Sequence, residues 1–335
     1  MKVVDMHCDT ISELADRGGR LYENTGQLDL KRMRQSGYLL QSFALFVDIG
    51  KFEPWDRVQE LYKVYCNELE KNEDWISPVL CYEDILHNEA AGKMSALLTV
   101  EEGAVCGGSL TKLRKLYAMG VRMLTLTWNY PNELGWPATC RNPEDASHRE
   151  VRNNTSDRNE CNPTTANKGL TEIGREFVAE MEYLGMIPDV SHLSDAGFDD
   201  VWEGTKKPFV ASHSNAREIC PSLRNLTDDR IRKLADRGGC IGLNYYDKFL
   251  VDGGSKCPEQ LLEAIVRHAR HIVNIGGMEV LGLGSDFDGI PVNAALPGAE
   301  SMPLLWDTLK KAGFSENELD GIFWKNVLRV YREAL

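Results

Sequence analysis

The sequence has too few basic residues to balance its acidic ones. Its 335 residues include 38 Lys and Arg against 51 Asp and Glu, which gives a net charge of −13 with histidine neutral. A protein that binds nucleic acid through the phosphate backbone needs a basic surface that releases counterions. The charge balance therefore argues against a nucleic-acid partner, and it disfavours binding to anionic membranes.

Long apolar runs are also missing. No run reaches the roughly 18 residues that a transmembrane helix needs. The start, MKVVDMHCDT, lacks the basic segment and apolar segment of a secretory signal. The nine cysteines are scattered without CxxC spacing, so they are expected to stay reduced. We therefore expect a cytoplasmic protein with no membrane partner.

Short apolar runs alternate with longer amphipathic ones, which is typical of repeated βα units. The helical spacing is clear at residues 56–71, 109–120, 170–185, 226–239 and 258–277. Eight strands are expected, at residues 2–7, 39–47, 94–101, 122–127, 187–192, 208–213, 240–245 and 280–286. This count favours an α/β fold with a distorted, TIM-like (β/α)8 barrel. A doubly wound open sheet is the alternative.

No linker rich in Pro, Gly or Ser divides the chain, so residues 1–335 are expected to form one domain. A polar stretch at about 129–168 has almost no apolar periodicity and reads as an insertion. The last part, at about 302–335, is predicted to be a helical pair. Ser315 and Glu318 have the spacing of a capping box at the start of its second helix.

Residues that can bind metal recur at the expected strand ends. In an extended strand residues i and i+2 share a face, so His7 and Asp9 are predicted to project together. Catalytic groups of parallel barrels come from the carboxyl ends of several strands. The other such residues are Glu101, His192, His213 and Asp286. Three imidazoles and three carboxylates gathered in one space would require cations, and this mixture suits zinc best, with manganese or iron as competitors.

Each of these features has a simpler reading when it is taken alone. A single strand-end histidine such as His192 is more often a hydrogen-bonded structural residue, and Glu101 next to Glu102 can be a solvated turn. His268 and His271 have helical i, i+3 spacing and could share a ligand, but a solvated outer face is favoured. The argument for a metal centre therefore depends on the strand ends converging.

Several short motifs occur in one order along almost the whole chain, from about residue 3 to about residue 330. They are His7-Cys8-Asp9, Val100-Glu101, Thr125-Leu126-Thr127, Asp189-Val190-Ser191-His192, Ser212-His213-Ser214, Arg224-Asn225 and Gly284-Ser285-Asp286-Phe287-Asp288-Gly289. Their order and spacing resemble the membrane (renal) dipeptidase family of zinc peptidases, in the amidohydrolase superfamily. The resemblance is to the bacterial cytosolic members.

The resemblance implies two zinc ions, with manganese, iron or cobalt as other possible metals. His7 and Asp9 would hold one ion and His192 with His213 the other. Glu101 would bridge them, in preference to Glu102, because it directly follows the apolar strand. The catalytic residues would be Asp286, as the acid/base, and Glu101.

The expected substrate is a dipeptide with a free C-terminal carboxylate, cleaved by a hydroxide held between the metals. Arg224 would bind that carboxylate, and Tyr246 is a weaker match to a substrate contact. The animal enzymes place a histidine after Thr-Leu-Thr, where this chain has Trp128-Asn129. Tryptophan cannot accept a proton, so Asn129 or another group would polarise the scissile carbonyl, or the preferred substrate differs.

Two other functions stay open at this point. One is a related amide hydrolase acting on N-acyl amino acids or lactams, and the other is a metal-binding protein without turnover. The resemblance also suggests a homodimer.

Overall fold

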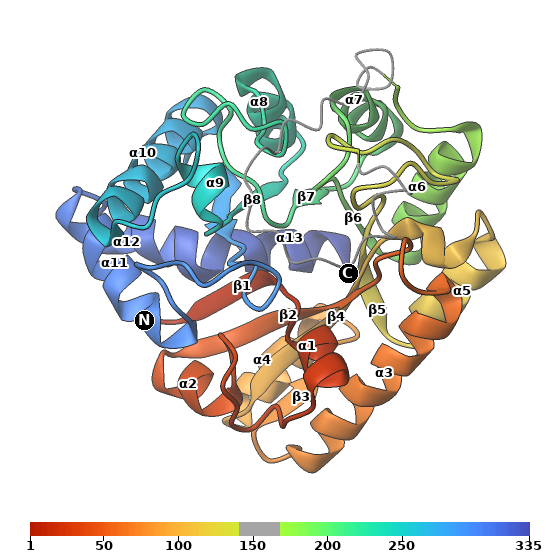
Figure 1. Cartoon of the computed structure of the whole chain (residues 1–335), viewed down its shortest axis with the longest axis horizontal. Coiled ribbons are helices and arrows are strands. Elements are labelled where there is room, and N and C mark those ends of the chain that lie inside the picture. Colours follow the sequence, from red (N-terminus) through yellow and green to blue (C-terminus); the bar gives the residue numbers. More distant parts are fainter. Residues whose placement is uncertain (141–167) are drawn as a thin grey trace.

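The structure is a computed structural model that describes residues 1–140 and 168–335. Most of the expected polar insertion, residues 141–167, therefore lies outside the described residues. Strands occupy the middle of the molecule and helices surround them (Figure 1). The strands are β1 (Val3–Cys8), β2 (Tyr38–Phe46), β3 (Ile76–Pro78), β4 (Met94–Glu101), β5 (Val121–Thr125), β6 (Ile187–Asp189), β7 (Val210–Ala211), β8 (Cys240–Leu243) and β9 (Leu281–Leu283).

Eight of these strands close into a parallel barrel. The order runs β2-β1-β9-β8-β7-β6-β5-β4, and β2 also pairs with β4, which joins the two ends. The short strand β3 was not expected from the sequence. It pairs with Met94–Ala96 at the start of β4, whereas β5 pairs with Leu98–Glu101 further along. The predicted (β/α)8 barrel is thus confirmed, with β3 as an addition to it.

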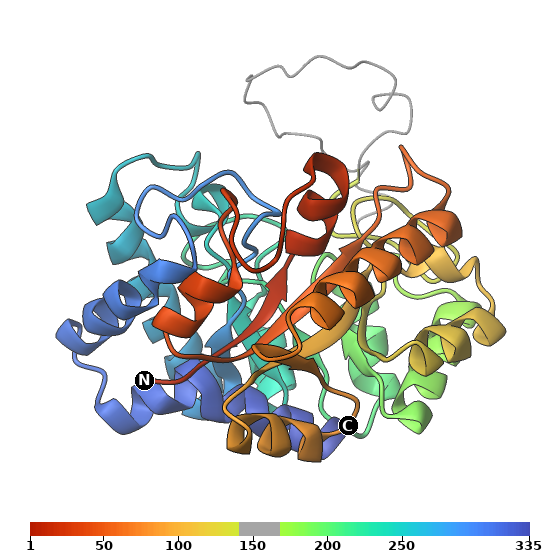
Figure 2. The ribbon, with the colours of Figure 1, turned by 90° about the horizontal axis from the view of Figure 1, so that it is seen from below.

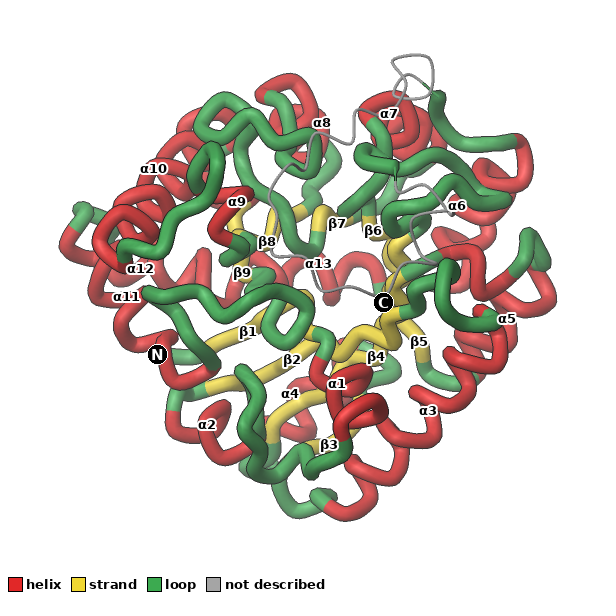
Figure 3. Tube along the Cα trace, in the orientation of Figure 1, coloured by secondary structure: helices red, strands yellow, loops and turns green. Residues whose placement is uncertain are grey.

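Helices cover the outside of the barrel (Figure 3). They are α1 (Thr10–Arg17), α2 (Leu30–Gln35), α3 (Pro54–Lys71), α4 (Tyr82–Ala90), α5 (Leu110–Ala118), α6 (Glu172–Leu184), α7 (Asp195–Gly204), α8 (Asp228–Asp236), α9 (Asp247–Leu250), α10 (Pro258–Gly276), α11 (Met302–Lys311), α12 (Glu316–Asp320) and α13 (Asn326–Ala334). The helices expected from spacing are present. α10 begins with proline, and Gly277 after it has a φ of 83°, as helix ends prefer. Within the two described ranges, none of the helices has the length and apolarity needed to cross a bilayer.

The predicted C-terminal helical pair is also present. α11 is its first helix, and α12, the π-turn Gly321–Lys325 and α13 form the second. Ser315 and Glu318 form the expected capping box.

The barrel interior is filled from its amino-terminal end. Inward side chains of the strands form one apolar cluster with α13; its strand members include Val4, Met6, Leu40, Leu97, Met123, Ile187, Val210 and Cys240. Figure 2 shows the dark blue C-terminal helices below the strands and α1 above them. The Tyr331 hydroxyl of α13 lies 2.9 Å from the Ser42 hydroxyl of β2, inside the barrel. With this end closed by apolar packing, polar side chains gather at the carboxyl end of the strands.

Candidate metal centre

A β-bulge turns His7 toward the inside of the barrel. Between Asp5 and Cys8, β1 uses three residue steps while β2 uses two, from Gln41 to Phe43. The extra residue breaks the alternation of faces. Met6 therefore packs in the interior apolar cluster, while His7, the next residue, contacts Glu101 from β4.

His192, His213 and Asp286 lie beyond the ends of their strands, so the expectation that they end extended strands was wrong. β6 stops at Asp189, β7 at Ala211 and β9 at Leu283. His192 and Asp286 have φ values of 68° and 63°, in the left-handed region that costs a non-glycine residue about 1–2 kcal/mol. These turns re-aim the side chains across the barrel mouth.

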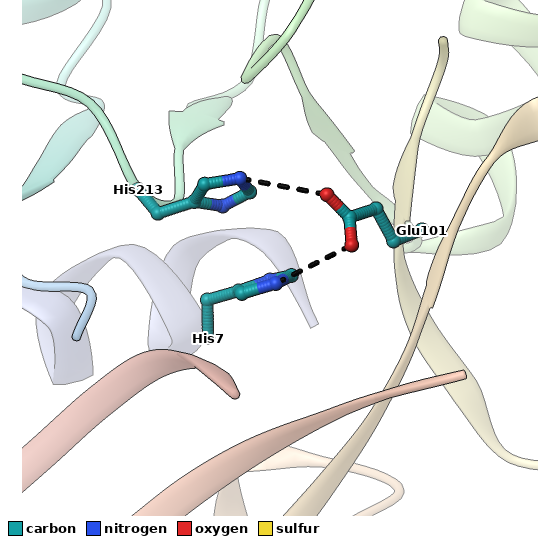
Figure 4. A group of neighbouring side chains, drawn as sticks. All are labelled: His7, Glu101 and His213. Carbon is teal, nitrogen blue, oxygen red and sulfur yellow. Dashed lines mark ion pairs between the residues drawn. The ribbon is translucent and has the colours of Figure 1, made fainter. Parts of the chain in front are cut away.

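Glu101 is the centre of the cluster. Its Oε2 lies 3.5 Å from Nε2 of His7, and its Oε1 lies 3.0 Å from Nε2 of His192 and 3.5 Å from Nε2 of His213. Figure 4 shows His7 and His213 on β1 and beyond β7 facing the two oxygens of this carboxylate. Side chains from four parts of the chain thus meet at one group, as the sequence predicted.

Two further carboxylates lie near the same nitrogen of His7. Nε2 of His7 is 3.4 Å from Oδ2 of Asp9 and 3.8 Å from Oδ1 of Asp286. Asp9 does not share a strand face with His7, because it lies past the end of β1 as the N-cap of α1. A side chain at Gly289 would collide with Oδ2 of Asp9, so glycine there lets the chain pass close to these two carboxylates.

This donor set fits divalent cations. Ligands about 2.0–2.1 Å from a tetrahedral zinc ion are about 3.4 Å from one another, and the nitrogen–oxygen distances here run from 3.0 to 3.8 Å. Nε2 of His7 and Oδ1 of Asp9 are buried and have no hydrogen-bond partner among the described residues. Two closely spaced ligand groups occur, His7 with Glu101 and His213, and His7 with Asp9 and Asp286. Both contain His7, so distance alone does not divide the ligands between two ions.

The electrostatics of the cluster point the same way. Burial disfavours a charged His7, but the carboxylates of Glu101 and Asp9 outweigh it and raise its pKa well above the usual value. Burial, together with Asp9 and Glu101, raises the pKa of Asp286 to about 7. Burial and the Arg224 charge lower the pKa of His192 to about 4. The carboxylates thus favour a positive charge at this place, and the neutral imidazole of His192 offers a lone pair. A metal cation could take the place of the proton on His7.

His192 is oriented by Asn129, a residue predicted to contact the substrate. Its Nδ1 lies 3.1 Å from Oδ1 of Asn129, and that oxygen also accepts a hydrogen bond from the Thr139 hydroxyl. A carboxamide oxygen can only accept, so Nδ1 of His192 carries the proton and Nε2 faces Glu101 with its lone pair. Trp128, the residue before, packs edge-on against Phe46 with its ring centroid 6.3 Å from that of His192.

Glu102 has a separate role in the local structure. Its carboxylate accepts hydrogen bonds from the backbone N–H groups of Ala104 and Trp128 and from the side chain of Asn132. Burial raises its pKa to about 7, although these donors oppose the shift. Its φ is 125°, an unusual value for a non-glycine residue. Glu102 therefore ties the end of β4 to the loop after β5 and does not contact the histidines.

Arg224 is buried at the edge of the cluster. Its Nη2 donates to the carbonyl of His213 at 3.3 Å, and its Nε has no hydrogen-bond partner among the described residues. Burial lowers the pKa of Arg224 to about 10, so it remains a cation at neutral pH. Tyr246 packs edge-on against Phe249, and the Arg224 guanidinium lies over the same Phe249 ring, 5.4 Å from its centroid. The two expected substrate-binding residues are thus linked through Phe249.

Three supporting residues were not singled out from the sequence. Asp189 and Ser212 lie beneath His213, and Asn244 donates to Oδ2 of Asp286 at 2.9 Å. Asp189 and Ser212 belong to the motifs that contain His192 and His213. Their place in these motifs pointed to the site, but their residue types did not reveal which role they have in it.

The chain is similar to known proteins of one family. The family model described as "Membrane dipeptidase (Peptidase family M19)" matches residues 1–335. An uncharacterized protein in the pqqA 5′ region of Klebsiella pneumoniae is 34% identical over 243 residues, covering 72% of this chain and 83% of that protein. A protein named dipeptidase aclJ from Aspergillus oryzae is 30% identical over 320 residues, covering 91% and 69%.

Solved structures share the fold along the whole chain. A structure described as a dipeptidase and metallopeptidase of family M19 has a TM-score of 0.84 at 25% identity, covering 100% of this chain and 98% of that one. A metallopeptidase from Rhodobacter sphaeroides, bound to a phosphinate mimic of the dipeptide L-Ala-D-Ala, has a TM-score of 0.85 at 23% identity, covering 100% and 99%. The chain belongs to the membrane dipeptidase family, peptidase family M19, and is a metallo-dipeptidase, a hydrolase that acts on peptide bonds.

Proposed function

We propose that the chain is a zinc-dependent dipeptidase that cleaves dipeptides with a free C-terminal carboxylate. The observation that carries the proposal is the position of Glu101, whose two oxygens lie between His7 on one side and His192 and His213 on the other. A carboxylate with imidazoles at both oxygens can bridge two cations.

The proposed ligands divide into two sets that share Glu101. His7 and Asp9 complete one set, and His192 and His213 complete the other. Two divalent ions in these sets would act as Lewis acids toward the scissile carbonyl and would make water acidic enough to react at neutral pH. The three imidazoles among the proposed ligands favour zinc over calcium or magnesium, which prefer oxygen ligands.

Asp286 is the proposed acid and base. Burial and its carboxylate neighbours raise its pKa to about 7, which suits a group that takes up and releases a proton near neutral pH. Asn244 donates to Oδ2 and leaves Oδ1 directed toward His7, 3.8 Å away. Oδ1 is therefore the atom proposed to take a proton from water and deliver it to the leaving amine.

Arg224 is proposed to bind the substrate carboxylate. Its guanidinium is buried and keeps donor capacity, since its Nε has no partner among the described residues. A guanidinium fork recognises a carboxylate with two parallel hydrogen bonds. The whole chain is strongly acidic and its net negative charge repels an anionic substrate. The local positive charge of Arg224 therefore has to outweigh this repulsion.

The proposal is tested with purified protein in two steps. Metal analysis should find zinc, and a panel of dipeptides built from L- and D-residues should be hydrolysed in a zinc-dependent way. N-acyl amino acids and dipeptide amides belong in the same panel, because the Trp128-Asn129 departure bears on substrate choice. Hydrolysis of N-acyl amino acids without hydrolysis of any dipeptide would replace the dipeptidase proposal by the amide-hydrolase one. The expected homodimer and cytoplasmic location stay predictions.

A further inference from the structure

Asp189 is a buried carboxylate that receives hydrogen bonds from two neighbouring strands. Its Oδ1 accepts from the backbone N–H groups of Ser191 and Ser212, each at 2.9 Å. Its Oδ2 accepts from the hydroxyls of Ser212 and Thr125, each at 2.6 Å. Asp189 can accept all four of these hydrogen bonds only when it is ionised.

The Ser212 hydroxyl continues this network to the imidazole of His213. Its Oγ lies 2.8 Å from Nδ1 of His213. A hydroxyl carries a single proton, and the 2.6 Å bond to Asp189 uses it. Ser212 must therefore accept at its other side, so Nδ1 of His213 is the protonated nitrogen. Nε2 is then left with its lone pair, and this atom lies 3.5 Å from Oε1 of Glu101 and 3.0 Å from Nε2 of His192.

We propose that Asp189 and Ser212 are positioning residues that fix the tautomer of His213 and so present its Nε2 lone pair to a metal ion. The proposal rests on the proposed function, since it assumes that His213 is a ligand. Partners of this kind on the second nitrogen of a ligating histidine orient the ring, and their loss typically weakens metal binding 10- to 100-fold.

The substitution Asp189→Asn should reverse the direction of the network. An asparagine can keep its oxygen toward the backbone N–H groups of Ser191 and Ser212, which places its NH2 group against the two hydroxyls. The Ser212 hydroxyl then accepts from asparagine and donates to Nδ1 of His213. The ring proton has to move to Nε2, where it blocks the proposed ligand atom. Ser212→Ala removes the link without reversing it.

Thr125→Val is the matched control. Thr125 donates to the same oxygen of Asp189 as Ser212 does, at the same 2.6 Å, and both residues are buried. Valine is close to threonine in shape, so the control removes one hydrogen bond from Asp189 while leaving the Ser212–His213 link intact.

The first measurement is the ¹⁵N spectrum of the histidine rings in the full-length chain after chelation, with His213 identified by its loss in a His213→Gln variant. Wild type and Thr125→Val should show the Nδ1–H tautomer at His213, and Asp189→Asn should show the Nε2–H tautomer. The second measurement is zinc affinity by competition with a chromophoric chelator. Ser212→Ala and Asp189→Asn should bind zinc roughly 10- to 100-fold more weakly, and Thr125→Val should bind like the wild type.

The two proposals fail in different ways. If the wild type binds no zinc, the proposed function is wrong. If the wild type binds zinc and Ser212→Ala binds it equally well with an unchanged His213 tautomer, the positioning role is overturned and the proposed function stands. Ser212→Ala carries the test even if Asp189→Asn does not fold, because it removes a single oxygen atom.

Discussion

Glu101 and Glu102 are consecutive residues whose carboxylates have no partner in common. Glu101 lies within 3.5 Å of three imidazole nitrogens, whereas Glu102 accepts hydrogen bonds from Ala104, Trp128 and Asn132. The chain achieves this with a φ of 125° at Glu102, directly after β4 ends. Two side chains of the same kind thus have different roles, Glu101 in the proposed metal centre and Glu102 in holding the loop after β5.

The two glutamates should respond differently to the same substitution. Glu101→Gln removes the charge between the imidazoles, so we expect zinc content to fall while the fold is kept. Glu102→Gln places an NH2 group against N–H donors and should lower the free energy of unfolding by about 1–3 kcal/mol, with zinc still bound. Metal analysis and urea unfolding of both variants check this. Zinc loss in Glu102→Gln together with full zinc in Glu101→Gln would contradict the assignment.

Asp286→Asn should separate metal binding from turnover. Asparagine has nearly the same shape but cannot take up a proton, so both metal ions should stay while kcat falls by about 10²- to 10⁴-fold. Asp288→Asn is the control, since Asp288 bonds the Thr10 hydroxyl and the Gln27 backbone and is not proposed to transfer protons. Normal turnover by Asp286→Asn would show that another group moves the proton.

Arg224→Ala should lower kcat/KM for dipeptides far more than kcat/KM for dipeptide amides. The two lost charge-assisted hydrogen bonds are each worth about 1.5–3 kcal/mol, so kcat/KM for dipeptides should fall roughly 10²- to 10⁴-fold. Arg217→Ala is the control, because the Arg217 guanidinium is already paired with both oxygens of Asp195. An equal loss for dipeptides and their amides would mean that Arg224 does not read the carboxylate.

Removing the metal should destabilise the fold reversibly. The three carboxylates of Asp9, Glu101 and Asp286 around His7 repel one another without cations. Metal binding at about 1,000 times Kd adds about 4 kcal/mol to the stability of the fold. We expect chelation to lower Tm and zinc to restore it, whereas calcium should not, because three of the ligands are imidazoles. Identical Tm values with and without zinc would argue against a metal centre in this cluster.

The sequence predicted which residues lie together, but it did not predict the backbone geometry that orients their side chains. Periodicity located the barrel strands, and the apolar run before Glu101 marked the end of β4 correctly. The bulge at His7 and the left-handed turns at His192 and Asp286 depend on pairing between strands that are distant in the chain, so a local pattern of faces could not reveal them. The three-residue strand β3 was too short to produce a periodic signal.

His268 is a second case in which a local sequence pattern could not predict long-range packing, here in a helix. Its helical spacing with His271 favoured a solvated face, but the structure buries it completely, with its ring nitrogens facing Ala216 in the loop after β7 and Leu250 at the end of α9. Nδ1 accepts from the Ala216 backbone N–H and Nε2 donates to the Leu250 carbonyl, each at 3.1 Å. This helix face is covered because the loop after β7 packs against it. The periodicity of the helix sequence carries no information about where that loop lies.

That burial predicts a pH dependence of stability. Burial lowers the pKa of His268 to about 4, so the unfolded chain takes up the proton at a higher pH than the native protein does. Stability should therefore be lost as pH falls from about 6.5 toward 4, by about 2 kcal/mol at pH 5 for this residue. A protonated Nδ1 would also face the Ala216 N–H donor, which gives the loss its structural cause.

His268→Gln provides the measurement. Glutamine can accept from Ala216 and donate to Leu250 without titrating, so urea unfolding of both proteins with zinc present isolates the contribution of the imidazole. We expect the stability difference between wild type and variant to shift by about 2 kcal/mol in favour of the variant between pH 8 and pH 5. Because the other histidines are common to both proteins, their titration cancels in this difference. A constant difference across that range would mean that His268 takes up a proton in the native protein as readily as in the unfolded chain.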